Sequence, residues 1–446
     1  MSLVIRWNRQ ASMTVALLAM SLTPTCWVVW TVWHVQSPLH ARAVETALSS
    51  TLGARVRIGS VTHPKPGRMV VRDFVRERPG SSDDGSGFVA SASRLETTRE
   101  HNELVVDVET LELRGASPRQ AVRELVAIPR DDASNAPRRV TIAVERCRIN
   151  FGDGLLFELF DCACILQHDA GGPVFTMSCR LGEGATSTRC EATATRDRST
   201  RLTSTRLTFK TMEGPAISTR FLDVFLDAGG WFGPAATFEG ELIVSLPDAA
   251  EPSIEFNGTI HDVDLGALVA SRFPNERLEG RARLTIDRAR WGDRRGQGFG
   301  WLEARGEIVS GPGSIGVPLL RSLVREMGFR AAPKLANLDP SRRDLDFRAL
   351  GLSFAINPDG RIALDGALGE QNAPDAVLTD AADVLARAPD RPSNVAGLIK
   401  TLHASANPPA GSLVPLTAES KLLMTLPVPT DAEVMPTLVP TDHINN

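Results

Sequence analysis

The sequence predicts a mainly β fold of the α+β class: an N-terminal single-pass transmembrane helix, then a long, largely antiparallel sheet with a few short amphipathic helices. Three observations lead to this prediction. An uncharged run occupies Thr14 to Trp33, short segments alternate apolar and polar residues from Arg55 onward, and most of these segments are joined by short connections. Alternation indicates strands with one buried face, and strands joined by short connections pair antiparallel.

The uncharged run is long enough to cross a membrane as a helix, because about 20 residues at ~1.5 Å per residue span about 30 Å. No Asp or Glu precedes Glu45, and Arg6 and Arg9 lie on the short N-terminal flank. Basic residues beside a spanning segment tend to stay in the cytoplasm. We therefore expect residues 1–13 to be cytoplasmic, residues 14–36 to form the anchor, and the remainder to lie in the periplasm, attached to the inner membrane.

The end of the run bears on whether the segment is retained. A cleaved secretory signal would have the same basic start but would end in small residues. Here the run ends with the bulky residues Trp27, Trp30 and Trp33, which suit the membrane interface. A retained anchor is the favoured interpretation, and a cleaved signal is the alternative.

Three regions follow the anchor: a first β-meander over 37–212, a second sheet region with interleaved helices over 213–370, and a C-terminal helix with a Pro-rich, partly disordered tail over 371–446. A helix is predicted from Pro38 to Leu52, ended by Gly53. Strands are predicted at 55–58, 69–75, 104–113, 140–151, 155–167, 174–181, 188–195 and 202–211.

The second half shows a weak repeat, in which a glycine is followed by a strand. The repeat occurs at Gly240, Gly258, Gly280, Gly306 and Gly360. Spacings of three and four residues between apolar positions predict short helices. These helices are expected at 217–227, 265–273, 317–327 and 375–388.

Five of the six cysteines are confined to positions 147–190. Folding the segment from Asp161 to Leu181 about Ala170 and Gly171 places Cys162 opposite Cys179, which makes this pair the preferred disulfide. The alternative is that these cysteines are small apolar strand residues. A zinc site is disfavoured, because no Cys-x-x-Cys pair or paired His supports one.

Composition and motifs point away from several function classes. A net charge of −4 and a pI near 6.1 lack the basic excess of a nucleic-acid-binding protein. The stretch Gly311 to Gly316 fits G-x-G-x-x-G, but no βαβ context is predicted around it, so a glycine turn is the favoured interpretation. His261, Asp262 and Asp264 are read as a turn or helix start rather than metal ligands. No catalytic, cofactor or metal site is predicted.

The chain resembles the AsmA-like proteins of bacterial envelopes. The resemblance rests on the anchor, on Leu48 to Ile58 leading into strands, and on Gly-led strands followed by a glycine turn and a helix between Glu279 and Phe329. It implies a curled sheet that forms a groove with an apolar floor, related to bridge-like lipid-transfer proteins. It also implies a role in moving phospholipid or in outer-membrane assembly, without a catalytic site.

The expected function is therefore that of a non-enzymatic, membrane-anchored envelope protein that handles phospholipid acyl chains. Its expected partners are the inner membrane, phospholipid and other envelope proteins, with no nucleic acid and no cofactor. The alternative is a structural or protein-interaction scaffold of the envelope that carries no lipid. About 18 strands at ~4.8 Å spacing give a sheet roughly 85 Å long, so we do not expect this chain alone to bridge two membranes.

Overall fold

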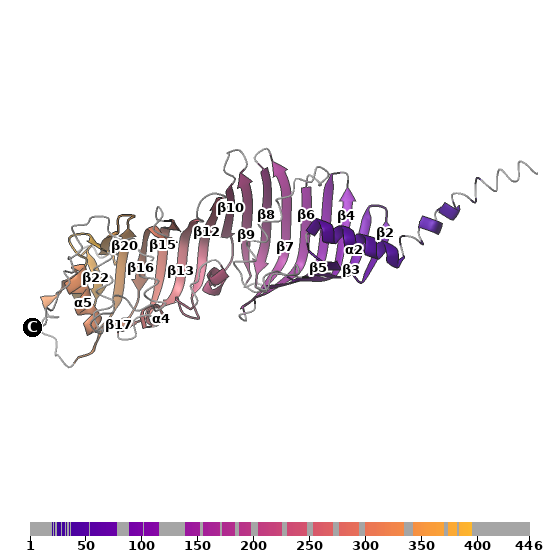
Figure 1. Cartoon of the computed structure of the whole chain (residues 1–446). Coiled ribbons are helices and arrows are strands. Elements are labelled where there is room, and N and C mark those ends of the chain that lie inside the picture. Colours follow the sequence, from indigo (N-terminus) through magenta and orange to yellow (C-terminus); the bar gives the residue numbers. More distant parts are fainter. Residues whose placement is uncertain are drawn as a thin grey trace, which may run out of the picture. The chain divides into compact units, whose positions relative to one another are not determined.

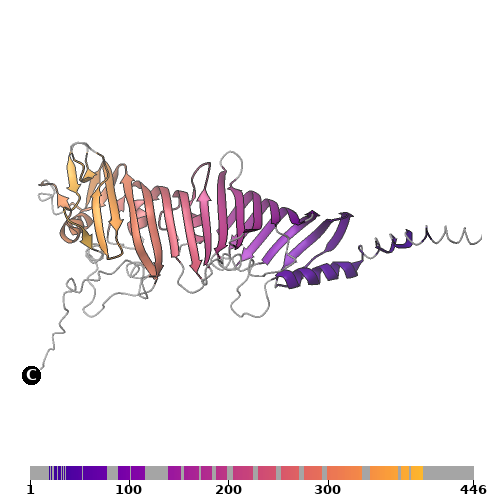
Figure 2. The ribbon, with the colours of Figure 1, turned by 90° about the horizontal axis from the view of Figure 1, so that it is seen from above.

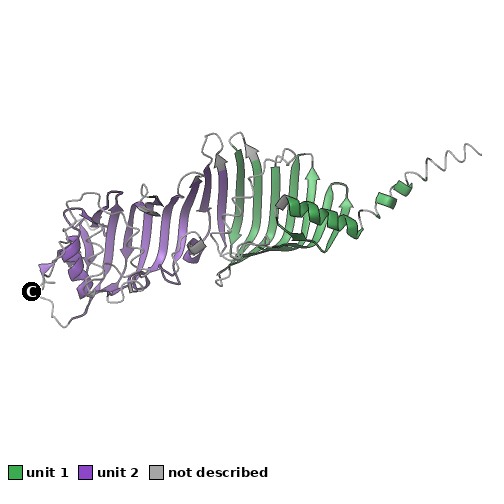
Figure 3. Ribbon diagram, in the orientation of Figure 1, with its two compact units in different colours: residues 1–184 green, residues 185–446 purple. Residues whose placement is uncertain are grey.

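The structure, a computed structural model, describes part of the N-terminal segment between residues 20 and 35 and most of the chain from residue 37 to 394. The described ranges are 37–52, 54–77, 89–100, 102–115, 139–151, 155–169, 172–182, 187–197, 204–224, 230–247, 253–270, 276–293, 299–333, 342–369, 373–380 and 383–394. These residues are mainly β (Figure 1). They belong to two compact units, residues 1–184 and 185–446, which are coloured separately in Figure 3.

The described part of unit 1 contains one long helix and eight strands. Their bounds are α2 Pro38–Leu52, β1 Val56–Arg57, β2 Ser60–Lys65, β3 Arg68–Arg76, β4 Val89–Glu100, β5 Glu103–Gly115, β6 Arg139–Phe151, β7 Leu155–Asp169 and β8 Gly172–Leu181. β1 and β2 both pair with β3, and the sheet continues from β3 to β8 in chain order. The pairs are antiparallel except for β5 with β6, which is parallel.

The helix predicted from Pro38 is confirmed and lies beside the first strands of unit 1 (Figures 1 and 2). Ser37 caps it, because its side-chain oxygen accepts a hydrogen bond from the backbone N–H of His40 at 3.3 Å. The hydroxyl of Ser49 accepts a hydrogen bond from the backbone N–H of Val56 at 3.0 Å. This contact ties the end of α2 to the first strand. Gly53, the expected helix stop, lies outside the described residues.

Three features of unit 1 depart from the sequence prediction. β2 was missed, because its sequence, SVTHPK, contains a proline and shows no alternation of apolar residues. β4 was missed, because its sequence, VASASRLETTRE, has few apolar residues and no strict alternation. The parallel pair of β5 and β6 was also not foreseen. Residues 116–138 connect these strands and supply the dozen or more residues that a parallel crossover needs.

Unit 2 contains the remaining elements. The strands are β9 Thr188–Asp197, β10 Ser204–Thr211, β11 Ile217–Ser218, β12 Thr237–Pro247, β13 Ser253–Asp264, β14 Leu278–Glu279, β15 Arg281–Asp293, β16 Phe299–Ser310, β17 Gly313–Gly316, β18 Arg330–Ala331, β19 Asp344–Phe347, β20 Ala349–Ile356, β21 Arg361–Gly366, β22 Ala376–Thr379, β23 Val384–Arg387 and β24 Ser393–Asn394. The helices are η3 Thr219–Val224, α4 Leu265–Ala270 and α5 Val317–Met327.

The main sheet of unit 2 is antiparallel and runs through β9, β10, β12, β13, β15, β16, β20 and β21. β14, β17 and β19 form a separate antiparallel sheet of three strands. β9 and β10 had been assigned to the first meander, with a boundary at 212. They belong to unit 2 instead, because β10 pairs with both β9 and β12.

The weak glycine repeat has a structural cause in unit 2. Gly240 pairs with Gly258, Gly258 with Ile286, and Ile286 with Gly306, so three of the repeat's glycines lie in one row across four strands. A Cβ on Gly258 would come within 3.0 Å of the Phe238 ring, and one on Gly306 within 3.2 Å of the Phe354 ring. The row therefore makes room for aromatic rings on the apolar face of the sheet.

The helix α5 covers the C-terminal strands of unit 2, as predicted from the spacing of its apolar residues. Its buried residues Leu319 and Leu320 pack with Leu345, Phe347 and Leu378. Pro318 lies in its first turn, and Gly328 ends it in the left-handed conformation at φ 77°. Here the apolar side of the sheet is filled by the chain's own helix.

The helix predicted from Asp375 to Ala388 is wrong, because this segment forms β22 and β23. All four residues of β22 are buried, which a one-sided helix would not allow. The Asp375 carboxylate accepts hydrogen bonds from Arg330 and Arg387, and so joins β18 to β23. Of the helix predicted over 217–227, Ile217 and Ser218 form β11 instead, Thr219–Val224 is a 3-10 helix, and residues 225–227 lie outside the described residues. The tail from 395 lies outside the described residues.

Candidate functional site

One face of the unit 1 sheet is apolar along six consecutive strands. Residues that pair across strands share a face, so the register identifies its members. On this face lie Met69, Val71, Phe74, Ala92, Leu95, Leu104, Val106, Val108, Leu111, Leu113, Val140, Ile142, Val144, Cys147, Ile149, Phe151, Phe157, Leu159, Cys162, Cys164, Leu166, Phe175, Met177 and Cys179. We call this surface the apolar face of unit 1.

In five neighbouring strands the alternation of inward and outward residues skips one position, and the skipped positions lie side by side across the sheet. We call this feature the phase shift. The row Val71, Leu95, Val108, Val144 and Cys162 is joined by strand pairing. The next row along the strands is Phe74, Ala92, Leu111, Cys147 and Leu159. In each strand the two members are three positions apart, whereas strict alternation would separate them by two or four. Each of these strands therefore changes the parity of its inward residues, and apolar side chains stay on this face on both sides of the shift, with Arg76 and Arg99 at its ends.

Backbone geometry accompanies this shift of phase. Asp73 in β3 and Asp161 in β7 lie between the two rows and have positive φ values of 56° and 49°. Such angles are uncommon outside glycine, and Asp is among the residues that tolerate them. At Asp161 the pairing of β7 with β8 also shifts register, so a β-bulge lies at this point. Sequence reasoning missed the shift, although the three-residue spacing of apolar residues was visible in each of these segments.

The opposite face of the unit 1 sheet carries ion pairs. Arg148 and Glu158, cross-strand neighbours, lie 2.9 Å apart from Nε to Oε1. Arg68 and Arg94 both contact Glu96, and the hydrogen bond from Arg68 holds the pKa of that carboxyl below its usual range. These ion pairs are thus confined to this face, which also carries apolar side chains such as Val70, Val105 and Ile165.

Part of the apolar face remains accessible. Two neighbouring rows of apolar side chains cross β5 to β8 at the strand ends that lie furthest from the phase shift. Every side chain in these two rows is half-buried. These rows are Leu104, Val140, Leu166 and Phe175, and Val106, Ile142, Cys164 and Met177. We call these eight residues the open patch. Four strands at ~4.8 Å spacing make the patch about 14 Å wide between its outer strands.

Four cysteines lie on the apolar face of unit 1, all recorded as thiols. Burial raises the pKa of Cys147 and of Cys164 to about 12, with a smaller contribution from Cys162. The pKa of Cys162 is instead lowered, chiefly by a hydrogen bond with Cys179. The hairpin of β7 and β8 has the register predicted by folding about Ala170 and Gly171, with Ala163 opposite Ser178. Cys190 is buried separately, in unit 2.

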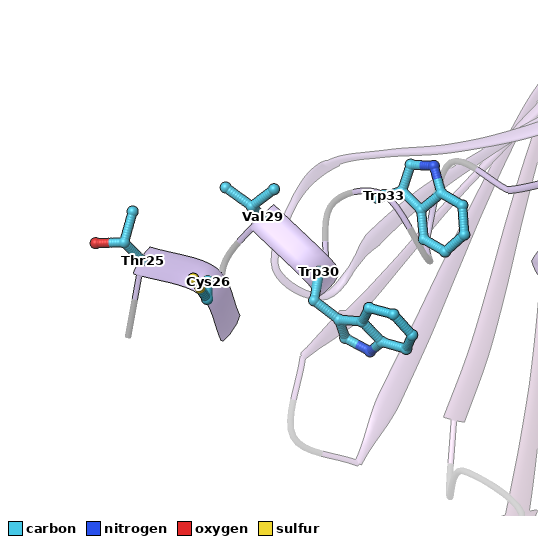
Figure 4. Close-up of a pocket in the computed structure, with 5 residues that line it drawn as sticks. All are labelled: Thr25, Cys26, Val29, Trp30 and Trp33. Carbon is cyan, nitrogen blue, oxygen red and sulfur yellow. The ribbon is translucent and has the colours of Figure 1, made fainter. Parts of the chain in front are cut away.

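The N-terminal segment displays its apolar side chains. Trp27, Trp30 and Trp33 are 72%, 60% and 64% exposed. Figure 4 shows Trp30 and Trp33 with Thr25, Cys26 and Val29, which together line a shallow apolar depression. Among the described residues, we found no helix with the length and apolar character needed to cross a bilayer. Arg6, Arg9 and many residues of the expected anchor lie outside the described part of the chain.

A histidine pair joins α2 to β2. The Nε2 atoms of His40 and His63 lie 3.0 Å apart, and the rings are 5.1 Å apart at their centroids. Burial lowers the pKa of His63, and the neighbouring His40 lowers it further. A hydrogen bond between the two rings requires one imidazole to donate and the other to accept.

The remaining sequence motifs have structural roles. Gly313 to Gly316 forms the strand β17 between two antiparallel partners, so the glycine pattern has no βαβ context. Asp264 acts at a helix start, because its Oδ1 accepts a hydrogen bond from the backbone N–H of Ala267 at 3.1 Å. His261 contacts Glu239 at 3.0 Å. Within the described ranges, no three His, Cys, Asp or Glu side chains are grouped so that they could hold a metal ion.

The open patch of unit 1 is therefore the strongest candidate site. Its chemistry is that of an apolar ligand surface, since its side chains offer neither charge nor hydrogen bonds beyond the weakly polar thiol of Cys164. Comparison of the chain with protein-family models, with curated proteins and with solved structures gave no match.

Proposed function

We propose that this chain is a non-enzymatic, membrane-anchored envelope protein that binds phospholipid acyl chains on the open patch of unit 1. The half-buried state of the eight patch residues carries this proposal. An acyl chain lying across them would lose contact with water, which favours binding by about 0.8 kcal/mol for each CH₂ that is buried. The proposal agrees with the resemblance to the AsmA-like proteins.

The N-terminal segment supports the attachment to a membrane. Among the residues that the structure describes, seven of the nine large, strongly exposed hydrophobic side chains belong to the segment from Met20 to Leu39: Met20, Leu22, Trp27, Val29, Trp30, Trp33 and Leu39. A soluble surface rarely concentrates so many apolar side chains in one stretch. We propose that residues 14–36 are held in the inner membrane and that the two units lie in the periplasm.

Membrane attachment is tested by extraction of isolated membranes with alkaline carbonate. We expect the full chain to remain in the membrane pellet, because a spanning helix is not released when peripheral contacts are broken. Replacing Trp27, Trp30 and Trp33 by Arg should move the chain to the supernatant. Release of the unaltered chain by carbonate would overturn the anchor.

Lipid binding is tested by photo-crosslinking from the sheet in membranes that contain radiolabelled phospholipid. A photo-reactive residue placed at Ile142 should capture lipid, because this side chain belongs to the open patch. The matched control is Thr141, its neighbour in β6, which faces the opposite side of the sheet. We expect at least a tenfold difference in captured label between the two positions.

A second variant separates lipid binding from folding. Ile142→Trp keeps the position apolar but fills the patch, so it should reduce crosslinking from Met177, two strands away in the same row, while circular dichroism stays unchanged. Equal labelling from Ile142 and Thr141 would contradict the lipid proposal. Capture of a discrete protein at Ile142, with no lipid, would favour the scaffold alternative.

A further inference from the structure

The hairpin of β7 and β8 brings two thiols together at its β-bulge. Leu159 pairs with Leu181 and Phe160 with Arg180, but the pairing resumes at Ala163 with Ser178. Asp161 and Cys162 therefore lie opposite the single residue Cys179. The positive φ of Asp161 turns Cys162 back toward the apolar face, where both cysteines are buried.

We infer that Cys162 and Cys179 form a disulfide across the bulge and that Cys147 and Cys164 remain thiols. The register selects this pair among the four cysteines of the face. Cys147 has Leu111 and Leu159 as its strand neighbours, and Cys164 has Ile142 and Met177. Cys162 and Cys179 meet across the bulge on the same face, where directly opposite residues have Cβ atoms about 4.5–5.5 Å apart, close to the ~3.5–4.5 Å of a disulfide.

The chemistry follows thiol–disulfide exchange with an external disulfide as the oxidant. The Cys162 thiolate attacks one sulfur of the oxidant and releases its other sulfur as a thiolate. Cys179 then attacks the mixed disulfide, so the S–S bond forms and the oxidant leaves as a second thiol. Two protons and two electrons pass from the protein to the oxidant. The hydrogen bond with Cys179 lowers the pKa of Cys162 from its ordinary value, whereas burial raises the pKa of Cys147 and of Cys164 to about 12.

This inference does not depend on lipid binding, because it rests on the register of one hairpin. A disulfide at this place would fix the bulge that directs Cys162 to the apolar face. It also requires an oxidising compartment, which the proposed periplasmic location supplies.

Mass spectrometry of the full chain in detergent tests the pairing. The purified protein is exposed to oxidised glutathione, denatured in acid, alkylated with N-ethylmaleimide and digested with trypsin. Arg148 and Arg180 bound one peptide that contains Cys162, Cys164 and Cys179. We expect this peptide to carry one maleimide and to be lighter by two hydrogens than the reduced peptide with the same label. After reduction and renewed alkylation it should carry three labels.

Variants identify the partners. Cys164→Ala should leave a peptide that takes up no maleimide, since its two remaining cysteines are bonded. Cys179→Ser should give a peptide that takes up two maleimides. A peptide in which Cys164 is bonded to Cys179, or a link to Cys147, would overturn the inference. So would full labelling of the unaltered, oxidised chain, a result that does not depend on how any variant folds.

Discussion

Gly258→Val is expected to destabilise unit 2 by about 4 kcal/mol or more, and to prevent its folding if the reserve of stability is small. A Cβ at this position would lie 2.3 Å from the carbonyl oxygen of Glu239 and 2.8 Å from the Cα of Gly240. Both contacts are with backbone, which cannot move away without breaking the pairing of β12 with β13. The φ of Gly258 is also +150°, a region that side chains of L-residues avoid.

Urea unfolding of the full chain, followed by far-ultraviolet circular dichroism, measures this effect. Gly311→Ala is the matched control, because no atom lies within 4 Å of the position of its Cβ. We expect the Gly311→Ala control to have the same urea concentration at its unfolding midpoint as the unaltered chain. Hydrogen exchange should locate the loss of protection in Gly258→Val to β12 and β13. Unchanged protection there would show that these strands do not pair as described.

Leu320→Ala in α5 is expected to lower the free energy of unfolding by about 2–5 kcal/mol, which is the second large effect. Leu320 is 4% exposed and belongs to the core cluster that α5 shares with Leu345, Phe347 and Leu378. Removing its side chain loses apolar contact and leaves a cavity, because the strands below are fixed by their own pairing. The C-terminal strands should then exchange their amides faster than the rest of unit 2.

Arg321→Ala provides the comparison for Leu320→Ala. Arg321 is the next residue of the same helix and is exposed, so its removal tests helix propensity without touching the core. We expect a change within about 0.5 kcal/mol. Equal destabilisation by the two variants would mean that α5 does not pack on the sheet through Leu320.

The sequence predicted those elements whose local pattern agrees with their tertiary environment. α5 has its apolar residues on one side, and the structure confirms its bounds from Val317 to Met327. The segment from Asp375 to Ala388 was misassigned, because its short apolar runs fit a helix or a buried strand equally well. Its tertiary surroundings determine that it forms strands, since the buried β22 pairs with both β20 and β23.

The candidate site was harder to foresee than the strands that build it. Alternation identified β5 to β8, but the identity of the shared face depends on strand register, which a local pattern does not determine. The phase shift made this harder, because Val144 and Cys147 would face opposite ways in a regular strand, yet both are buried. The hairpin of β7 and β8 was the exception, since its short turn fixes the pairing.

The aligned phase shift also bears on how distant relatives could be recognised. A search profile that assumes unbroken alternation will divide each of these strands in two. It will assign the inward-facing residues of one half to the outward-facing side. Substitutions can replace the individual residues, but an insertion or deletion between the two rows in one strand would shift its side chains out of register with those of the neighbouring strands. Homologues should therefore share the position of the skipped residue in successive strands, even where no amino acid is retained.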